Sequence, residues 1–167
     1  MIENQKIMIS SSLGAVVAAV INAVPFLNFI NCFCCIGIVA GGAIALYHYD
    51  RSMEITEFIS TATAITLGIT TGIIAAFISL LLEWIVFTQF GNWYANLILR
   101  MVENMEDIPS FMEDMIAELK RESQYGFFWS SILLRNLIIM PLFCLIGSLI
   151  TRGYLNRNRT NNDLIQT

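Results

Sequence analysis

The cysteines are the residues of this sequence whose spacing most suggests chemistry. Three of the four fall in the stretch NCFCC at residues 31–35, and the fourth stands far along the chain. Zinc usually takes two separated pairs of cysteine or histidine, and the single histidine, His48, provides no second pair. An iron–sulfur cluster also lacks a nearby fourth ligand. We therefore predict no metal and no cofactor, and interpret Cys32, Cys34 and Cys35 as small packing side chains, with a disulfide or redox role as the alternative.

Two charged residues, Glu83 and Arg135, fall inside apolar segments, where a charge is costly and usually finds a partner. In the topology derived below, both belong to the outer leaflet, and three asparagines lie at similar depth: Asn22, Asn31 and Asn136. We predict a pair between Glu83 and Arg135 with the asparagines around it, acting as a structural clamp rather than a substrate site. The alternative places Glu83 in the headgroups while Arg135 extends to the interface.

Other catalytic patterns are absent from the sequence. It contains no P-loop, dinucleotide fingerprint, nucleophile elbow or zincin motif. His48 stands between Tyr47 and Tyr49, which favours interfacial anchoring over proton transfer. The net charge is −4 and no basic run is present, which argues against a nucleic-acid partner. We predict that the protein is not an enzyme.

The bulk composition sets the class of protein that must position these residues. The chain has 167 residues, of which 56% are hydrophobic and only 13% are charged, and its mean hydropathy is +0.67. Soluble domains carry about 25% charged residues, and small ones bury only about two-thirds of their surface. So much apolar surface indicates an all-α integral membrane protein, with the lipid bilayer as its main partner.

The apolar stretch at residues 7–49 contains no charge and is too long for one span, since about 20 residues cross the hydrocarbon core. Pro25 and the asparagines around it predict a turn that divides the stretch into two helices, with a single kinked element as the alternative. Two later apolar runs complete a single membrane domain at residues 1–155, followed by a frayed polar tail at 156–167. The four predicted spans are 8–24, 30–49, 57–87 and 128–151.

An acidic segment with helical periodicity separates the last two spans. Its apolar residues recur at the spacing of one helix face, which predicts an amphipathic helix at about 108–123. Four spans place both termini on one side of the membrane. That side carries more Lys and Arg than the other, so the positive-inside rule favours cytoplasmic termini. The compared residues are Lys6, Arg51, Arg152, Arg157 and Arg159 against Arg100, Lys120 and Arg121.

Small residues occur at helix-packing spacing in three of the predicted spans, beginning with Gly14 and Ala18 in the first. Small side chains let helix backbones approach closely in lipid, where such packing drives association. We expect these faces to pack on other helices of the same chain, with an oligomer or partner interface as the alternative. The packing residues are Gly37, Gly41 and Gly42 in the second span, and Ala64, Gly68, Gly72 and Ala76 in the third.

The run PFLNFINCFCCIGIVAGGAIALYHY resembles the first hairpin of small four-span membrane proteins of bacteria to which no activity is assigned. In those proteins an Asn-Cys-x-Cys-Cys sequence is followed by Gly-Gly and an exit of the type Ala-x-Tyr-x-Tyr. A glycine-rich third span and an apolar last span with a short basic tail complete the similarity. The resemblance implies a four-span protein of the bacterial cytoplasmic membrane and brings no activity with it.

These observations favour a non-enzymatic integral membrane protein that serves as an accessory, scaffold or assembly factor, in a homo-oligomer or a larger membrane complex. The small number of charges in the spans and the packing motifs support this interpretation. The alternative is a small transporter or channel subunit, in which Glu83, Arg135 and the asparagines would line a polar cavity in the outer leaflet. A membrane enzyme ranks third, because no acid–base pair with a workable geometry is visible.

Overall fold

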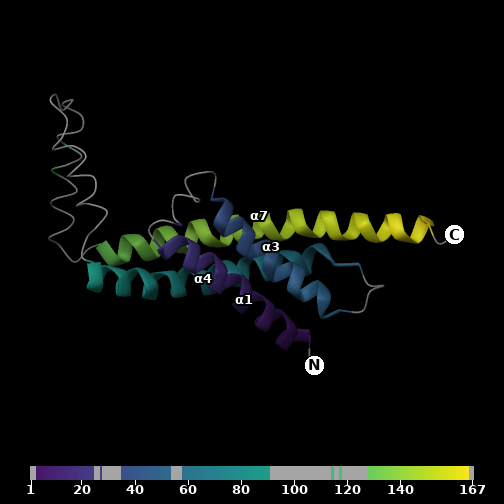
Figure 1. Ribbon diagram of the computed structural model, residues 1–167, viewed down its shortest axis with the longest axis horizontal. Coiled ribbons are helices and arrows are strands. Elements are labelled where there is room, and N and C mark those ends of the chain that lie inside the picture. Colours follow the sequence, from purple (N-terminus) through teal and green to yellow (C-terminus); the bar gives the residue numbers. More distant parts are fainter. Residues whose placement is uncertain are drawn as a thin grey trace.

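The computed structural model describes residues 3–24, 27, 35–53, 58–90, 114, 117 and 128–165. These residues form an all-helical bundle and contain no strand. Figure 1 shows α4 and α7 side by side along the long axis, with α1 and α3 packed beside them. In Figure 1, α1 begins below the bundle and α7 ends at its right-hand end. The four helices are α1 at Glu3–Ala23, α3 at Ile36–Arg51, α4 at Thr61–Phe90 and α7 at Phe128–Ile165.

Three of these helices are long and apolar enough to cross a membrane: Glu3–Ala23, Thr61–Gln89 and Ser130–Thr160. The fourth helix, α3, has 16 residues in the described part of the chain, fewer than the roughly 20 that a span requires. The predicted second span begins at residue 30, and residues 28–34 lie outside the described part. The all-helical class is confirmed for the described residues, which supply three helices able to span a membrane where the sequence predicts four spans.

The predicted amphipathic helix at 108–123 falls almost entirely outside the described residues. Asp114 and Ala117 are described, and both are helical. The remainder of that prediction lies where the structure gives no description.

The C-terminal segment differs from the frayed tail that the sequence predicts, because α7 continues as a helix to Ile165. The extension is held by contacts with the other helices and their connection. Asn156 exchanges hydrogen bonds with the backbone of Ile59, and Arg159 forms an ion pair with Asp50. Since these partners are distant in sequence, local polarity alone could not indicate that the segment is ordered.

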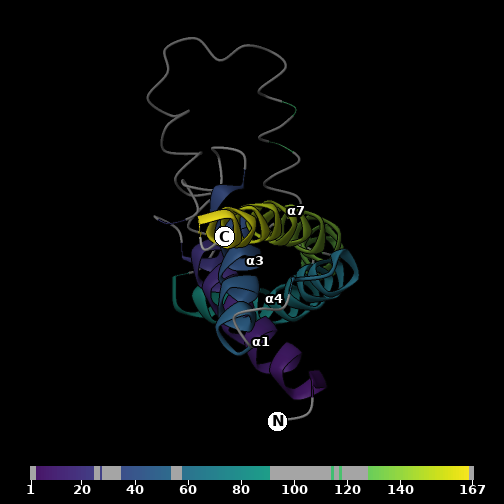
Figure 2. The ribbon, with the colours of Figure 1, turned by 90° about the vertical axis from the view of Figure 1, so that its right-hand side faces the viewer.

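Close backbone contacts between helices explain the compactness of the bundle. A Cβ atom added to Gly14 would meet the carbonyl oxygen of Gly41, and one added to Gly42 would meet the carbonyl oxygen of Cys144. Gly147 approaches the Val39 carbonyl in the same way. Seen from the side in Figure 2, α3 accordingly lies between α1 and α7. Small residues thus replace the large side chains that would hold these helices apart.

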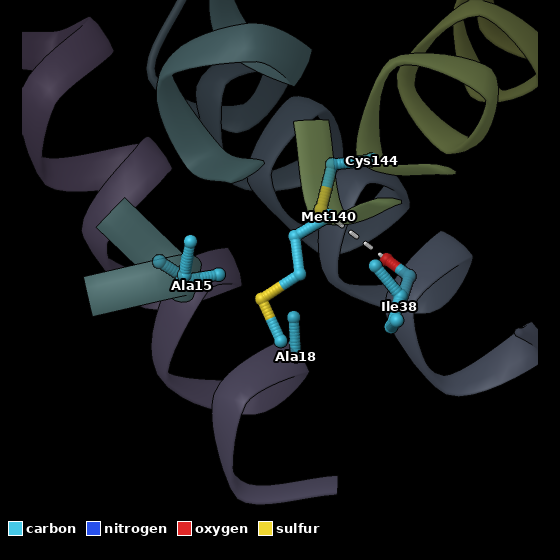
Figure 3. Packing of buried hydrophobic residues seen from close by; sticks show 7 residues of the cluster. Ala15, Ala18, Ile38, Met140 and Cys144 are labelled. Atoms are coloured by element: carbon cyan, nitrogen blue, oxygen red, sulfur yellow. Dashed lines mark hydrogen bonds between the residues drawn. The ribbon is translucent and has the colours of Figure 1, made fainter. Parts of the chain in front are cut away.

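The core is built from small side chains around one long one. Met140 of α7 is 1% exposed, and it packs among Ala15 and Ala18 of α1 and Ile38 of α3 (Figure 3). Cys144, one turn after Met140, donates a hydrogen bond from its Sγ to the carbonyl oxygen of Ile38 at 3.4 Å (Figure 3). Methionine suits such a position because its unbranched side chain fills irregular gaps.

Candidate functional site

Four polar side chains meet at the end of the bundle away from the chain termini, and we call them the carboxylate cluster: Asn22, Ser79, Glu83 and Asn136. They come from α1, α4 and α7, the three helices that are long and apolar enough to span a membrane. Ser79 and Glu83 are one helical turn apart on α4, so their side chains lie on the same face. The cluster therefore joins all three long helices at one place.

Three donors converge on a single oxygen of the Glu83 carboxylate. The Nδ2 of Asn22 donates to Glu83 Oε1 at 2.8 Å, and the Nδ2 of Asn136 donates to the same oxygen at 3.2 Å. The hydroxyl of Ser79 donates to it as well, at 3.1 Å. A further bond of 2.7 Å runs from the Asn22 amide to Ser79 Oγ. All three donors are electrically neutral, so they hold the carboxylate in place without cancelling its charge.

Burial makes this arrangement unusual for a charged group. Ser79 is fully buried and Asn136 is 3% exposed, while Asn22 and Glu83 are half-buried. On α7, Asn136 stands between Ile132 and Met140, one turn to either side, and both of these are buried too. The asparagine thus lies on the core-facing side of its helix, where an amide without a partner would be costly.

The sequence predicts an ion pair between Glu83 and Arg135, and the structure does not form it. Arg135 is exposed, and in the described part of the chain it forms no ion pair with Glu83. The physical reason is helical rotation: successive residues point about 100° apart at 3.6 residues per turn. Because Asn136 faces the cluster, its neighbour Arg135 faces outward. Asn31, the third predicted asparagine, lies outside the described residues.

Ser79 is the member of the cluster that the sequence interpretation missed. A serine in an apolar helix usually bonds to its own backbone and gives no sign of a site. The available signal was its position four residues before Glu83, which places the two side chains next to each other.

The cysteines show no cluster in the described part of the chain, since Cys32 and Cys34 lie outside it. Cys35 is half-buried against the core and immediately precedes α3. Its backbone is in the left-handed region, with φ 54°, and its carbonyl oxygen accepts hydrogen bonds from the amides of Ile38 and Val39. Cys144 is fully buried. In the described residues, no group of three His, Cys, Asp or Glu side chains is arranged to hold a metal.

The predicted packing residues lie in helix contacts within the chain. Gly37, Gly41 and Gly42 are buried in α3. On α4, Gly68 faces Leu145 and Ser148 of α7, and Gly72 faces Met140 and Pro141 of the same helix. Ala64 and Ala76 are fully buried. The small residues of α3 and α4 are therefore occupied by neighbouring helices of the same chain.

A second polar region lies at the end of the bundle that carries both termini, and we call it the connection cluster: Lys6, Asp50, Arg152, Asn156 and Arg159. Arg152 Nε donates to the carbonyl oxygen of Ile59 at 2.9 Å. Asn156 donates to that oxygen at 3.0 Å and accepts from the Ile59 amide at 3.1 Å. Lys6 donates to the carbonyl oxygen of Ser52 at 2.8 Å. This cluster therefore holds the connection between α3 and α4.

The residues around His48 lie in this end of the bundle. His48 Nδ1 is 2.9 Å from the hydroxyl of Ser10, which is fully buried. Tyr47 is exposed and receives both a hydrogen bond and a cation–π contact from Arg51, whose Cζ lies 4.9 Å from the ring centroid. Tyr49 is 2% exposed, so it packs in the core and does not serve as the interfacial anchor that the sequence suggests.

Comparisons with known proteins leave the function to be argued from this geometry. No family model matches the sequence, and no match was found among curated proteins or solved structures. The resemblance to small four-span bacterial proteins remains a prediction. A fold alone does not determine function, so the helix packing and the two polar clusters are the features that bear on it.

Proposed function

We propose that this chain is a non-enzymatic integral membrane protein of the accessory, scaffold or assembly-factor class. In this proposal it spans the bacterial cytoplasmic membrane four times, with both termini in the cytoplasm, and associates with copies of itself or with a larger membrane complex. The bilayer is its main partner, and nucleic acid is not one.

The observation that carries the proposal is the close packing of α4 on α7. At Gly68 and Gly72, a single added carbon atom would meet backbone atoms of α7. Helices in such contact leave no room between their backbones for a solute at this level of the bundle. A closed bundle fits a protein whose surface, rather than its interior, performs its role.

The position of α3 supports the fourth span. It packs on both α1 and α7, where Gly41 faces the backbone of α1 and Gly42 that of α7. A helix placed in this way shares their membrane environment. An even number of spans agrees with the first turns of α1 and the last turns of α7 both lying near the connection between α3 and α4, where Lys6 bonds to Ser52 and Arg159 pairs with Asp50.

Purification of the tagged full chain from native membranes in a mild detergent, followed by mass determination, tests the proposal. We expect a stable assembly of defined stoichiometry, larger than the monomer. Labelling of engineered cysteines near both termini should occur only from the cytoplasmic side. A chain that is monomeric in native membranes, or termini on opposite sides, would contradict the proposal.

The alternative, a small transporter or channel subunit, is favoured by the carboxylate cluster. A carboxylate surrounded by amides within membrane helices is a common feature of ion pathways. Reconstitution of the purified chain in liposomes would support this alternative if it produced an ion flux that Glu83→Gln abolishes.

A further inference from the structure

The Glu83 carboxylate lacks a positive partner among the side chains that the structure describes. Its hydrogen bonds come from Asn22, Ser79 and Asn136, and each donor is neutral. A full negative charge within three apolar helices is unfavourable unless something offsets it. The exposed Arg135 does not do so.

We propose that the carboxylate cluster binds a monovalent metal cation, for which sodium has the best size and charge. This inference goes beyond the proposed accessory role. It depends only on α1, α4 and α7 being embedded together in the membrane.

The four side chains of the carboxylate cluster, from three helices, can each offer an oxygen ligand to a cation. A half-turn of each asparagine amide exchanges its nitrogen for its oxygen, because the two atoms occupy equivalent positions. Asn22 and Asn136 then offer one oxygen each, beside the Ser79 hydroxyl and the Glu83 carboxylate. The bonded polar atoms of the cluster are 2.7–3.2 Å apart. These are hydrogen-bond separations, so a hard cation with oxygen ligands at about 2.3–2.6 Å would take the place of these hydrogen bonds, and the four side chains would move apart to surround it.

Charge selects a monovalent ion. The cluster carries one negative charge, so a monovalent cation makes it neutral, whereas a divalent cation would leave a positive charge among apolar helices. The ligands are hard oxygen donors, which disfavours the softer transition metals. In the described part of the chain, no histidine or cysteine joins the cluster.

The position of the cluster predicts what binding does. The ligands come from α1, α4 and α7, so a bound ion ties the ends of three helices together. An ion that binds the folded bundle and not the unfolded chain stabilises the fold by mass action. The proposal can therefore be measured as an ion-dependent unfolding temperature.

The experiment measures thermal unfolding of the purified full chain in lipid nanodiscs, at fixed pH and ionic strength. Sodium chloride is compared with choline chloride, whose cation is too large for the cluster. We expect sodium to raise Tm by about 5–10 °C at a concentration 100-fold above its Kd. Equal Tm values in the two salts would overturn the proposal, and so would a Tm that responds to protons but not to sodium.

Variants test whether the sodium-dependent shift in Tm arises at the carboxylate cluster. Glu83→Gln should remove the sodium-dependent shift, while Glu3→Gln, at an exposed carboxylate in the first turn of α1, should keep it. If Glu83→Gln does not fold, Ser79→Ala provides a milder test and should raise the Kd for sodium about tenfold. A sodium shift of unchanged size and midpoint in Ser79→Ala, or one retained in Glu83→Gln, would contradict the proposal. Because the purified chain is used, this result is independent of the assembly test of the proposed function.

Discussion

The charged side chains of the two polar clusters, which lie at opposite ends of the bundle, have different kinds of partner. In the connection cluster, Arg159 faces Asp50, and the donors of Arg152 and Lys6 reach backbone carbonyl oxygens. In the carboxylate cluster, Glu83 is held by neutral donors alone among the described residues. The connection cluster anchors the backbone at Ser52 and Ile59, next to the connection between α3 and α4. The carboxylate cluster instead leaves the negative charge of Glu83 without an opposite charge beside it in the described part of the chain. This difference leads us to assign a structural role to the first cluster and a binding role to the second.

The largest change in stability is expected from a substitution in α4, one of the helices that connect the two clusters. Gly72→Ala places a carbon against the backbone of Met140 and Pro141, and should lower stability by about 3 kcal/mol or more through overpacking, because backbone atoms cannot move aside as a flexible side chain can. Gly153→Ala on α7 is the matched control, because nothing lies within 4 Å of its added carbon. That variant should raise stability by about 0.5–1 kcal/mol through helix propensity. Denaturant titration in detergent measures both, and effects of the same sign would contradict the packing described.

The next largest change in stability comes from removing a carboxylate, and the two clusters can be compared directly in this way. Glu83→Ala leaves the amides of Asn22 and Asn136 without their shared acceptor, which should lower stability by about 1–3 kcal/mol. Asp50→Ala removes one partner of a half-buried ion pair and should cost about 1 kcal/mol or less. If Asp50→Ala proves more destabilising than Glu83→Ala, the contrast between the clusters is wrong.

A more local effect is expected from Asn156→Ala in the connection cluster. The change removes two hydrogen bonds to the backbone of Ile59, worth about 1–2 kcal/mol together. Hydrogen exchange should accelerate at residues 58–60 while the α4–α7 contact around Gly72 stays protected. Unchanged exchange at Ile59 would mean that Asn156 does not hold this connection.

The smallest expected effect is a gain in stability from a substitution at Thr71, which lies on α4 between the two clusters. The hydroxyl of Thr71 is buried in α4 without a hydrogen-bond partner in the described residues. Thr71→Val keeps the shape and removes the unsatisfied group, so stability should rise by about 1 kcal/mol. Thr66→Val is the control, since the Thr66 hydroxyl is exposed and already bonded to the Ala62 carbonyl oxygen. A loss of stability in Thr71→Val would show that this hydroxyl has a partner in the membrane.

The sequence alone indicates at which level along the helices the polar residues lie, but not toward which side of each helix they point. Counting residues from the ends of the apolar runs places Asn22, Glu83 and Asn136 at one level, and the structure brings these three together. The same counting cannot choose between Arg135 and Asn136, because they differ by about 100° around α7. That choice depends on the buried face of α7, which is set by packing against α4.

The helical class could also be predicted from the sequence, because long apolar runs with only 13% charged residues overall indicate membrane-spanning segments, which are helical unless they form a closed barrel. The extension of α7 to Ile165 could not be predicted. It depends on contacts of Asn156 with Ile59 and of Arg159 with Asp50, and no local pattern reveals such distant partners.

Direct binding of radioactive sodium to the purified chain tests the cation site at the carboxylate cluster most closely. We predict saturable, equimolar binding to the wild-type chain and to Glu3→Gln, competed by unlabelled sodium, and none to Glu83→Gln. Absence of saturable binding to the wild-type chain, or equal binding to folded Glu83→Gln, would contradict the assignment of a cation site to the carboxylate cluster.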